Sequence, residues 1–156
     1  PGVTALLPIR ELYEKPARAD GVADFGGRTA LVTGAAGAVG SLAVQLFRRL
    51  GLRVVGCAGN DEKVTLVREL GAADCWNYRR ETDPAAALQR VAPEGVDVFF
   101  DNVGGAVFDA VLDNIAMNAR IAICGQISQY NAIDVPQGPR NLAVLTRTRS
   151  RIEGLT

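Results

Sequence analysis

The segment from Thr33 to Gly40 reads TGAAGAVG, and its glycine spacing could bind phosphate. It follows a short apolar run and precedes apolar residues at helical spacing. Because glycine has no Cβ, the backbone can turn tightly out of a strand and let a pyrophosphate approach the N–H groups at the start of a helix. The dinucleotide fingerprint is G-x-G-x-x-G, and Ala35 stands in place of its first glycine. The alternative is a packing turn that binds nothing.

The end of the next predicted strand carries no acidic residue where many dinucleotide-binding domains have one. An Asp or Glu about 20 residues after the glycine turn accepts hydrogen bonds from an unphosphorylated ribose, but residues 57–60 here read CAGN. Lys63 lies in the first turn of the following predicted helix. A cation there interacts unfavourably with the helix dipole unless a nearby anion compensates its charge. A ribose 2′-phosphate would be such an anion. The alternative is a surface lysine paired with Asp61 or Glu62.

Polar residues also follow the third, fourth and fifth predicted strands. Tyr78 could donate its hydroxyl to the same phosphate or lie beside the adenine, or it could be a tyrosine at the edge of the core. Asn102 could present its amide to the nicotinamide-side ribose, or it could form an Asx turn that shapes the glycines after it. Asp101 is interpreted as a cap, since no second carboxylate lies at a useful spacing for acid chemistry. The loop from Cys124 to Tyr130 could line a nicotinamide, or it could be an ordinary surface loop.

Alternating strand and helix patterns position all of these residues. Strands are predicted at 28–33, 53–58, 73–78, 96–100, 120–124 and 151–155, with Trp76, Phe99 and Phe100 assigned to the core. Helices are predicted at 41–50, 64–70, 84–91 (capped by Asp83 before Pro84), 107–115 and 142–145, with a loop over 126–139. Strands that are buried on both faces and alternate with helices imply parallel pairing.

The expected fold is therefore α/β: a doubly wound, mostly parallel sheet of about six strands, the Rossmann fold. Residues 1–27 are expected to form a helix and a loop that lead into this domain, and residues 28–156 the domain itself. Ligands bind such sheets beyond the carboxyl ends of the strands. That rule predicts a site at the strand ends after residues 32, 58, 78, 100 and 124.

Composition narrows the classes of partner. The 156 residues are 48% apolar and 22% charged, with 17 basic and 17 acidic residues and no histidine. No basic block suggests nucleic acid or a membrane surface, and no metal site is expected. Three separated cysteines in apolar contexts are typical of reduced thiols in a cytoplasmic protein. A start at Pro1 and a stop at Thr156 within an apolar pattern suggest a piece of a longer protein.

Six motifs in order resemble one family. The chain is similar to the prostaglandin reductase and alkenal (enone) reductase branch of the zinc-independent medium-chain dehydrogenases/reductases, from its first residues to about Glu153. The motifs are AAGAVGS at 35–41, DEK at 61–63, NY at 77–78, FDNVGG at 100–105, CGQISQYN at 124–131 and PGVTA at 1–5. In that family an N-terminal GroES-like domain and further C-terminal residues close the substrate cleft, and neither is present in this sequence.

The resemblance implies NADPH-dependent reduction of the C=C bond of α,β-unsaturated ketones or aldehydes. It assigns the pyrophosphate to Gly37, Ala38, Val39 and Gly40, the 2′-phosphate side to Lys63 and Tyr78, and another cofactor contact to Asn102. It places Cys124, Gly125, Gln126, Ile127, Ser128, Gln129 and Tyr130 along the nicotinamide half, with the Tyr130 hydroxyl as the candidate catalytic group. Quinone reduction within the same superfamily is an alternative. Another is a non-catalytic nucleotide-binding module that dimerises through the edge of its sixth strand.

Overall fold

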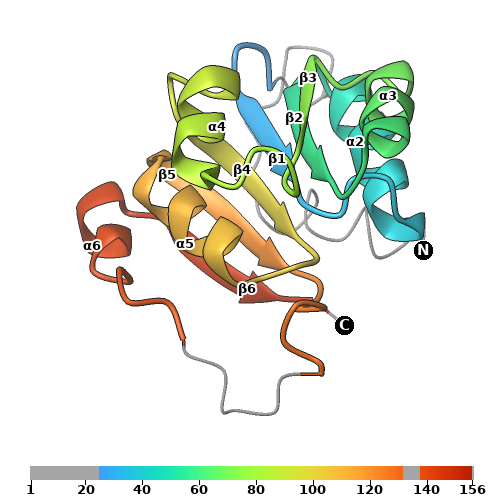
Figure 1. Cartoon of the computed structure of the whole chain (residues 1–156). Coiled ribbons are helices and arrows are strands. Elements are labelled where there is room, and N and C mark those ends of the chain that lie inside the picture. The colour runs from blue at the N-terminus through green and yellow to red at the C-terminus, as the bar shows by residue number, and fades with distance from the viewer. Residues whose placement is uncertain (1–24, 132–137, 156) are drawn as a thin grey trace.

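A six-stranded parallel sheet forms the centre of the computed structural model, which describes residues 25–131 and 138–155 (Figure 1). Its strand order is β3-β2-β1-β4-β5-β6, and every neighbouring pair is parallel. The strands are β1 (Thr29–Val32), β2 (Arg53–Ala58), β3 (Asp74–Asn77), β4 (Val96–Asp101), β5 (Ile115–Ile123) and β6 (Arg151–Gly154). The first strand, β1, lies in the middle of the sheet; the next two strands build outward to β3, and the chain then returns to place β4 on the other side of β1. This order confirms the predicted Rossmann fold.

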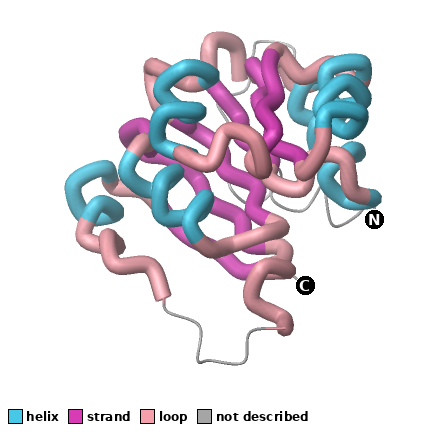
Figure 2. Tube along the Cα trace, viewed as in Figure 1, coloured by secondary structure: helices cyan, strands magenta, loops and turns pink. Residues whose placement is uncertain are grey.

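Helices cover both faces of the sheet (Figure 2). They are α2 (Ala38–Arg49), α3 (Asp61–Glu69), α4 (Pro84–Val91), α5 (Ala106–Asp113) and α6 (Val144–Thr148). On one face, α2 and α3 bury Phe47 and Val67 against Phe100 and other strand residues. On the other face, α4, α5 and α6 bury Leu88, Leu112 and Val144. The two apolar layers explain why the central strands are buried on both sides.

The predicted core aromatic residues are buried. Trp76 is 1% exposed, and Phe99 and Phe100 are fully buried. The rings of Phe47 and Phe100 meet edge to face with centroids 6.1 Å apart. The cap of α4 is also as predicted, since the Asp83 carboxylate accepts hydrogen bonds from the N–H groups of Ala85 and Ala86.

Some boundaries differ from the prediction. Helix α2 begins at Ala38 and α3 at Asp61, both earlier than the apolar spacing indicated, because the first turns carry few apolar residues. Ile115 was predicted on a helix, but it opens β5 and pairs with Val96. The register then shifts, and Asn118 takes a φ of 61° within the irregular stretch. Helix α6 runs over Val144–Thr148 rather than 142–145. The expected leading helix and most of its loop lie outside the described residues.

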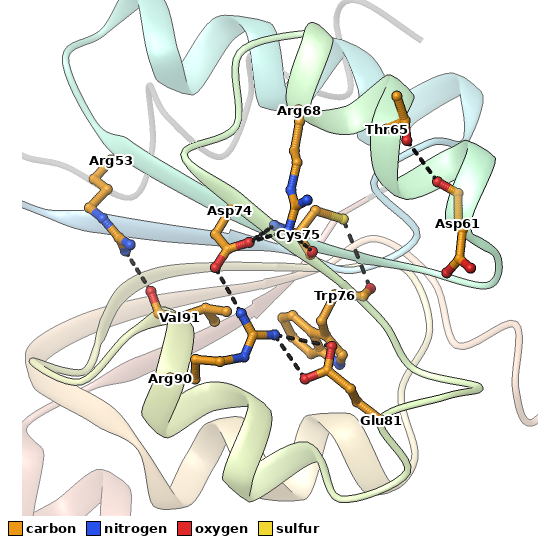
Figure 3. A network of polar contacts seen from close by, with 10 residues as sticks. All are labelled: Arg53, Asp61, Thr65, Arg68, Asp74, Cys75, Trp76, Glu81, Arg90 and Val91. Carbon is orange, nitrogen blue, oxygen red and sulfur yellow. Dashed lines mark hydrogen bonds and ion pairs between the residues drawn. The ribbon is translucent and has the colours of Figure 1, made fainter.

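Asp74, at the start of the edge strand β3, joins helices from both faces of the sheet (Figure 3). Its carboxylate accepts one hydrogen bond from Arg68 of α3 at 2.7 Å and another from Arg90 of α4 at 2.9 Å. Arg90 also forms an ion pair with Glu81 at 2.8 Å. These contacts fix β3 at the edge, and with it the residues that follow β3 toward the carboxyl ends of the strands.

Asp74→Asn is expected to lower the free energy of unfolding by about 1 kcal/mol at neutral pH. Burial works to raise the pKa of Asp74, but hydrogen bonds from Arg68 and the Cys75 N–H, with the charges of both arginines, lower it overall. Since the folded-state pKa lies below the unfolded value of about 3.9, the carboxylate stabilises the fold above that pH. This stabilisation is lost as the pH falls through the folded-state pKa.

Urea unfolding of wild type and the Asp74→Asn variant across acidic and neutral pH measures this difference. The difference in the free energy of unfolding between wild type and the variant should be present at neutral pH and disappear in strongly acidic solution. Glu69→Gln, which removes a carboxylate from an exposed position, is the control and should change stability little. A gap that persists unchanged into strong acid would contradict the ionic role of Asp74.

Candidate functional site

The glycine turn lies where β1 ends and α2 begins. Ala35 donates its N–H to the carbonyl of Cys57 in β2, and Gly37 donates to the carbonyl of Gly34. The first α-helical hydrogen bond of α2 runs from the Ser41 N–H to the Gly37 carbonyl. The N–H groups of the first three helical residues, 38–40, therefore have no acceptor within the helix. These N–H groups lie at the positive end of a 12-residue helix with no acidic residue in its first turn, an arrangement that favours an anion there.

Two glycines allow this turn to close. Gly34 has a φ of 58°, in the left-handed region that favours glycine. A Cβ on Gly40 would overlap the carbonyl oxygen of Gly34 and would lie 2.9 Å from the Ala35 Cα. Only glycine at position 40 lets the helix pack this closely against the turn. Ala35 is fully buried, so its methyl group fills space in the core where the fingerprint has a glycine.

A buried polar network ties the end of β1 to the end of β4. The Thr33 hydroxyl donates to Asp101 Oδ1 at 2.6 Å and accepts from the Asn102 N–H at 2.8 Å. The Asn102 side-chain amide donates to the Thr33 carbonyl at 2.7 Å. Burial raises the pKa of Asp101, while hydrogen bonds from Thr33, Gly104 and Val103 offset part of that increase.

This network gives Asp101 the role interpreted from the sequence, whereas Asn102 differs from the Asx-turn alternative. Asp101 accepts hydrogen bonds from the N–H groups of Val103 and Gly104, so it caps the glycine turn, as interpreted from the sequence. Asn102 was weighed as the residue that shapes this turn, but its amide crosses to β1 instead. The cause is the parallel pairing of β1 with β4, which brings Thr33 beside Asn102 across 69 residues of sequence. Asn102 also lines the cavity described below.

The end of β2 lies beside Lys63 and Tyr78. Asn60 caps α3 by accepting a hydrogen bond from the backbone N–H of Lys63 at 2.8 Å. Asp61 does not form an ion pair with Lys63, because its carboxylate accepts from Arg80 and from the Asn77 amide, both at 2.7 Å. The hydrogen bond from Asn77, followed by that from Arg80, lowers the pKa of Asp61. Within residues 25–131 and 138–155, the exposed Lys63 side chain has no ion-pair partner.

Gly59 makes room for the tyrosine. A Cβ at position 59 would lie 2.7 Å from the Tyr78 hydroxyl oxygen, so a side chain there would displace the tyrosine from this position. Tyr78 is 37% exposed, and its hydroxyl lies close to Gly59, directly after the end of β2. The glycine at this strand end therefore matches the position of Tyr78, a contact between two segments that the sequence alone did not reveal.

The loop after β5 packs beside the end of β4. Ser128 donates both its hydroxyl and its N–H to the Val103 carbonyl, at 2.5 and 3.1 Å. Gln126 lies against Gly104. The Tyr130 hydroxyl folds back over the loop and accepts a hydrogen bond from the Gln126 N–H at 3.2 Å, although the Tyr130 side chain is 69% exposed. Its hydroxyl proton is therefore left to donate elsewhere.

The five predicted strand ends meet at one cavity of about 430 Å³. The residues around it include those predicted from the pyrophosphate turn, Lys63, Tyr78, Asn102, Cys124, Ile127 and Tyr130. Gly125, Gln126, Ser128 and Gln129 do not line it. The sequence interpretation missed Gly34, Ala36, Ala58, Gly59 and Val103, which also line the cavity. Small residues beside a strand end are the signal that could have indicated them. A larger hollow of about 570 Å³ lies beside Arg48, Gly51 and Leu52, before the start of β2 and away from these strand ends.

The described residues contain no cluster of three or more His, Cys, Asp or Glu side chains able to hold a metal ion. Within the same residues, no helix has the length and apolar character needed to cross a membrane.

Cysteine labelling provides a test of the site geometry. Cys57 and Cys75 are buried, and Cys124 is half-buried at the cavity. Burial, with the charge of Asp101, raises the pKa of Cys124; burial raises the pKa of Cys75 to about 12 and also raises that of Cys57. Native protein treated with iodoacetamide should therefore be labelled slowly, at Cys124 alone, and faster as the pH rises. Mass spectrometry of Cys124→Ser, which should stay unlabelled until unfolded, is the control. Native labelling of Cys57 would contradict the structure.

The chain matches the zinc-binding dehydrogenase family over residues 38–156. It is 47% identical over 155 residues to the NADP(+)-dependent 2-alkenal reductase of Nicotiana tabacum, and the matched region covers 99% of this chain and 42% of that protein. It is 45% identical over 130 residues to prostaglandin reductase 1 of Mus musculus, covering 83% of this chain and 39% of the mouse protein. The chain thus spans about two fifths of the length of these relatives.

Solved structures show the same similarity. CurA from Vibrio vulnificus in complex with NADPH superposes with a TM-score of 0.85 at 37% identity, covering 100% of this chain and 45% of CurA. The quinone oxidoreductase of Thermus thermophilus, solved with its NADPH complex, has a TM-score of 0.69 at 27% identity and covers 98% of this chain and 43% of that one. From the family match and these relatives, the chain belongs to the zinc-binding dehydrogenase family of medium-chain dehydrogenases/reductases, in the enone reductase branch.

Proposed function

We propose that this chain is the NADPH-binding domain of an enzyme that reduces the C=C bond of α,β-unsaturated ketones or aldehydes. One observation carries the proposal: five strand ends meet at one cavity, with helix N–H groups in its wall, Lys63 and Tyr78 on one side and Tyr130 on the other. An alkenal reductase and a prostaglandin reductase among the relatives support this substrate class.

The residues around the cavity fit the cofactor in size and chemistry. Gly40 and Gly59 both line the cavity and put no side chain into it, so a cofactor can approach the backbone at these two positions. The N–H groups of residues 38–40 would bind the pyrophosphate, as would be expected of a helix N-terminus. Lys63 and the Tyr78 hydroxyl would bind the 2′-phosphate, and Asn102 would lie against the cofactor further along.

When bound, NADPH supplies the hydride for the reduction of the double bond. The loop from Cys124 to Tyr130 would lie along the nicotinamide half, where Cys124, Ile127 and Tyr130 face the cavity. Tyr130 is the candidate catalytic residue: its hydroxyl already accepts a hydrogen bond from Gln126, so its proton is available to the enolate oxygen that develops on the substrate. Tyr130 is exposed in this domain. Positioning the substrate and excluding water therefore require further parts of the whole protein. We assign them to a separate, GroES-like catalytic domain, and we expect the domain alone to bind cofactor without turnover.

Titration with NADPH and NADH, followed by nicotinamide fluorescence, tests the proposal. Wild type should prefer NADPH, and Lys63→Ala should weaken NADPH binding about tenfold while leaving NADH binding nearly unchanged, because a charge-assisted contact to phosphate is lost. Glu62→Gln, one residue away and exposed, is the charge control and should alter neither affinity by more than about twofold. Equal affinity of wild type for the two cofactors would contradict the proposal.

Quinone reduction is the second candidate, favoured by the similarity to the Thermus thermophilus quinone oxidoreductase. Assays of the whole protein on matched panels of enones and quinones distinguish the two activities. Higher kcat/KM on the quinones would replace the first proposal with the second. A whole protein that binds NADPH tightly but reduces neither panel would support the non-catalytic module instead.

We also propose a cytoplasmic homodimer that forms through the edge of the sheet. β6 pairs with β5 over four residue pairs and is the last strand in the sheet order. An edge strand presents backbone N–H and C=O groups to a second copy. Light scattering after size exclusion should give twice the chain mass, and a proline in place of Ile152 should yield monomer; a monomeric wild type would overturn this assignment.

A further inference from the structure

Arg79 follows Tyr78 in the turn after β3 and lies next to the end of β2. The pairing of Ala58 with Asn77 brings these two strand ends together, and the Tyr78 N–H donates to the Ala58 carbonyl at 3.1 Å. The backbone N–H of Arg79 donates to the buried side chain of Asn77 at 3.0 Å. The position of Arg79 is therefore determined by the sheet and by a buried amide, although its side chain is exposed.

The side chain of Arg79 turns back toward Gly59. Its Nε lies 3.6 Å from the Cβ position of Gly59, the same point from which the Tyr78 hydroxyl oxygen is 2.7 Å away. Gly59, Lys63 and Tyr78 line the cavity at this end. Arg79 is not part of the cavity lining, but the Nε of its guanidinium lies at the border of the cavity, near the hydroxyl of Tyr78.

Neighbouring Arg80 has a different environment. Its guanidinium donates to Asp61 Oδ2 at 2.7 Å and lies at a separate hollow formed with Asp61 and Asn77. Across residues 25–131 and 138–155, by contrast, the guanidinium of Arg79 has neither an ion pair nor a side-chain hydrogen bond. Of these two consecutive arginines, Arg80 is neutralised by a carboxylate, whereas Arg79 keeps its charge available beside the cavity.

We propose that Arg79 is a specificity-determining residue that binds the 2′-phosphate of NADPH together with Lys63 and Tyr78. A phosphate monoester carries up to two negative charges and three acceptor oxygens. Lys63 supplies one positive charge as a compact ammonium group, and Arg79 supplies the second as a planar fork that can bind two phosphate oxygens at once. Asp61, at the start of α3, accepts hydrogen bonds from Arg80 and Asn77 instead of pairing with Arg79, which leaves Arg79 to the ligand. The inference rests on the proposed function, because it concerns the same cofactor.

Paired variants test this role by binding rather than by turnover. Affinities for NADPH and NADH are measured by calorimetry for wild type, Arg79→Gln, Arg79→Lys and Arg80→Gln, with adenosine 2′,5′-bisphosphate and adenosine 5′-monophosphate as smaller probes. Arg79→Gln should weaken NADPH and the bisphosphate about tenfold and leave NADH and the monophosphate within about twofold. Arg79→Lys should recover part of the loss, since it restores charge without the fork. Arg80→Gln makes the same change of charge one residue away; because it also frees one oxygen of Asp61, it should lower the ratio of the two affinities somewhat, but clearly less than Arg79→Gln does.

The outcomes separate the two proposals. If wild type prefers NADPH but Arg79→Gln keeps that preference, or if Arg79→Gln and Arg80→Gln lose it equally, the role of Arg79 is overturned and the proposed function stands. If Arg79→Gln weakens NADPH and NADH alike, Arg79 acts through the fold or the general field, and the assignment is again overturned. If wild type shows no preference for NADPH, the proposed function itself fails.

Discussion

Gly40→Ala is expected to lower the free energy of unfolding by about 3 kcal/mol, at the upper end of what overpacking costs. The added methyl group would overlap the carbonyl oxygen of Gly34 and approach the Ala35 Cα to 2.9 Å. All of these atoms belong to backbone that is held in place, since Ala35 donates to Cys57 and Gly37 donates to Gly34. The helix and the turn must therefore move apart, and no side-chain rotation can relieve the contact.

The same change is expected to weaken NADPH at least about 100-fold, because the displaced N–H groups of residues 38–40 no longer converge on the pyrophosphate. Urea unfolding and calorimetric titration measure the two effects. Gly154→Ala is the matched control: a Cβ there meets no atom within 4 Å, and Gly154 lies in β6, away from the turn. A Gly40→Ala variant with the stability and affinity of Gly154→Ala would show that the close packing of the turn is unnecessary.

Asp101→Asn is expected to destabilise the protein by about 3 kcal/mol, even though the side chain keeps its shape. The carboxylate accepts hydrogen bonds from Thr33, Val103 and Gly104, and both of its oxygens are used. An amide has one acceptor oxygen, so its NH₂ group would face a donor in a fully buried position. Removing the charge relieves the burial that raises the pKa of Asp101, but it also takes one acceptor oxygen away from the fixed N–H of Gly104.

Glu94→Gln, which makes the same change of carboxylate to amide at an exposed position, should be within about 0.5 kcal/mol of wild type. Thr33→Val should reproduce part of the Asp101→Asn loss, since it removes the hydroxyl that joins Asp101 to the Asn102 N–H. Additive losses in the double variant would contradict a shared network, because residues in one hydrogen-bond network are coupled.

The sequence alone was sufficient for the fold and for the edge of the sheet at which the candidate residues meet. Strands such as 96–100 are short apolar runs, and helices such as 84–91 begin with a cap and a proline; both signals depend on neighbouring residues only. Parallel strands joined by right-handed crossovers then have few possible arrangements, and their carboxyl ends share one edge. This is why the pyrophosphate turn, Lys63, Tyr78, Asn102 and Tyr130 could be predicted to gather at one edge of the sheet. The prediction for Ile115 was wrong for the same reason: it depended on neighbouring residues only, and an apolar residue beside a helix fits the period of a helix or of a strand.

The tertiary structure alone decided which partner each polar side chain takes. Asp61 could pair with Lys63 next to it, but Asn77 and Arg80 from another segment occupy it and leave Lys63 exposed at the cavity. Asn102 could shape its own turn, but Asp101 does so and Asn102 reaches Thr33. Likewise, Gly59 makes room for Tyr78, and Arg80 pairs with Asp61 while, among the described residues, Arg79 pairs with no acid. Hydrogen bonds of this kind depend on distances between segments that lie far apart in the chain, and residue spacing carries no information about those distances.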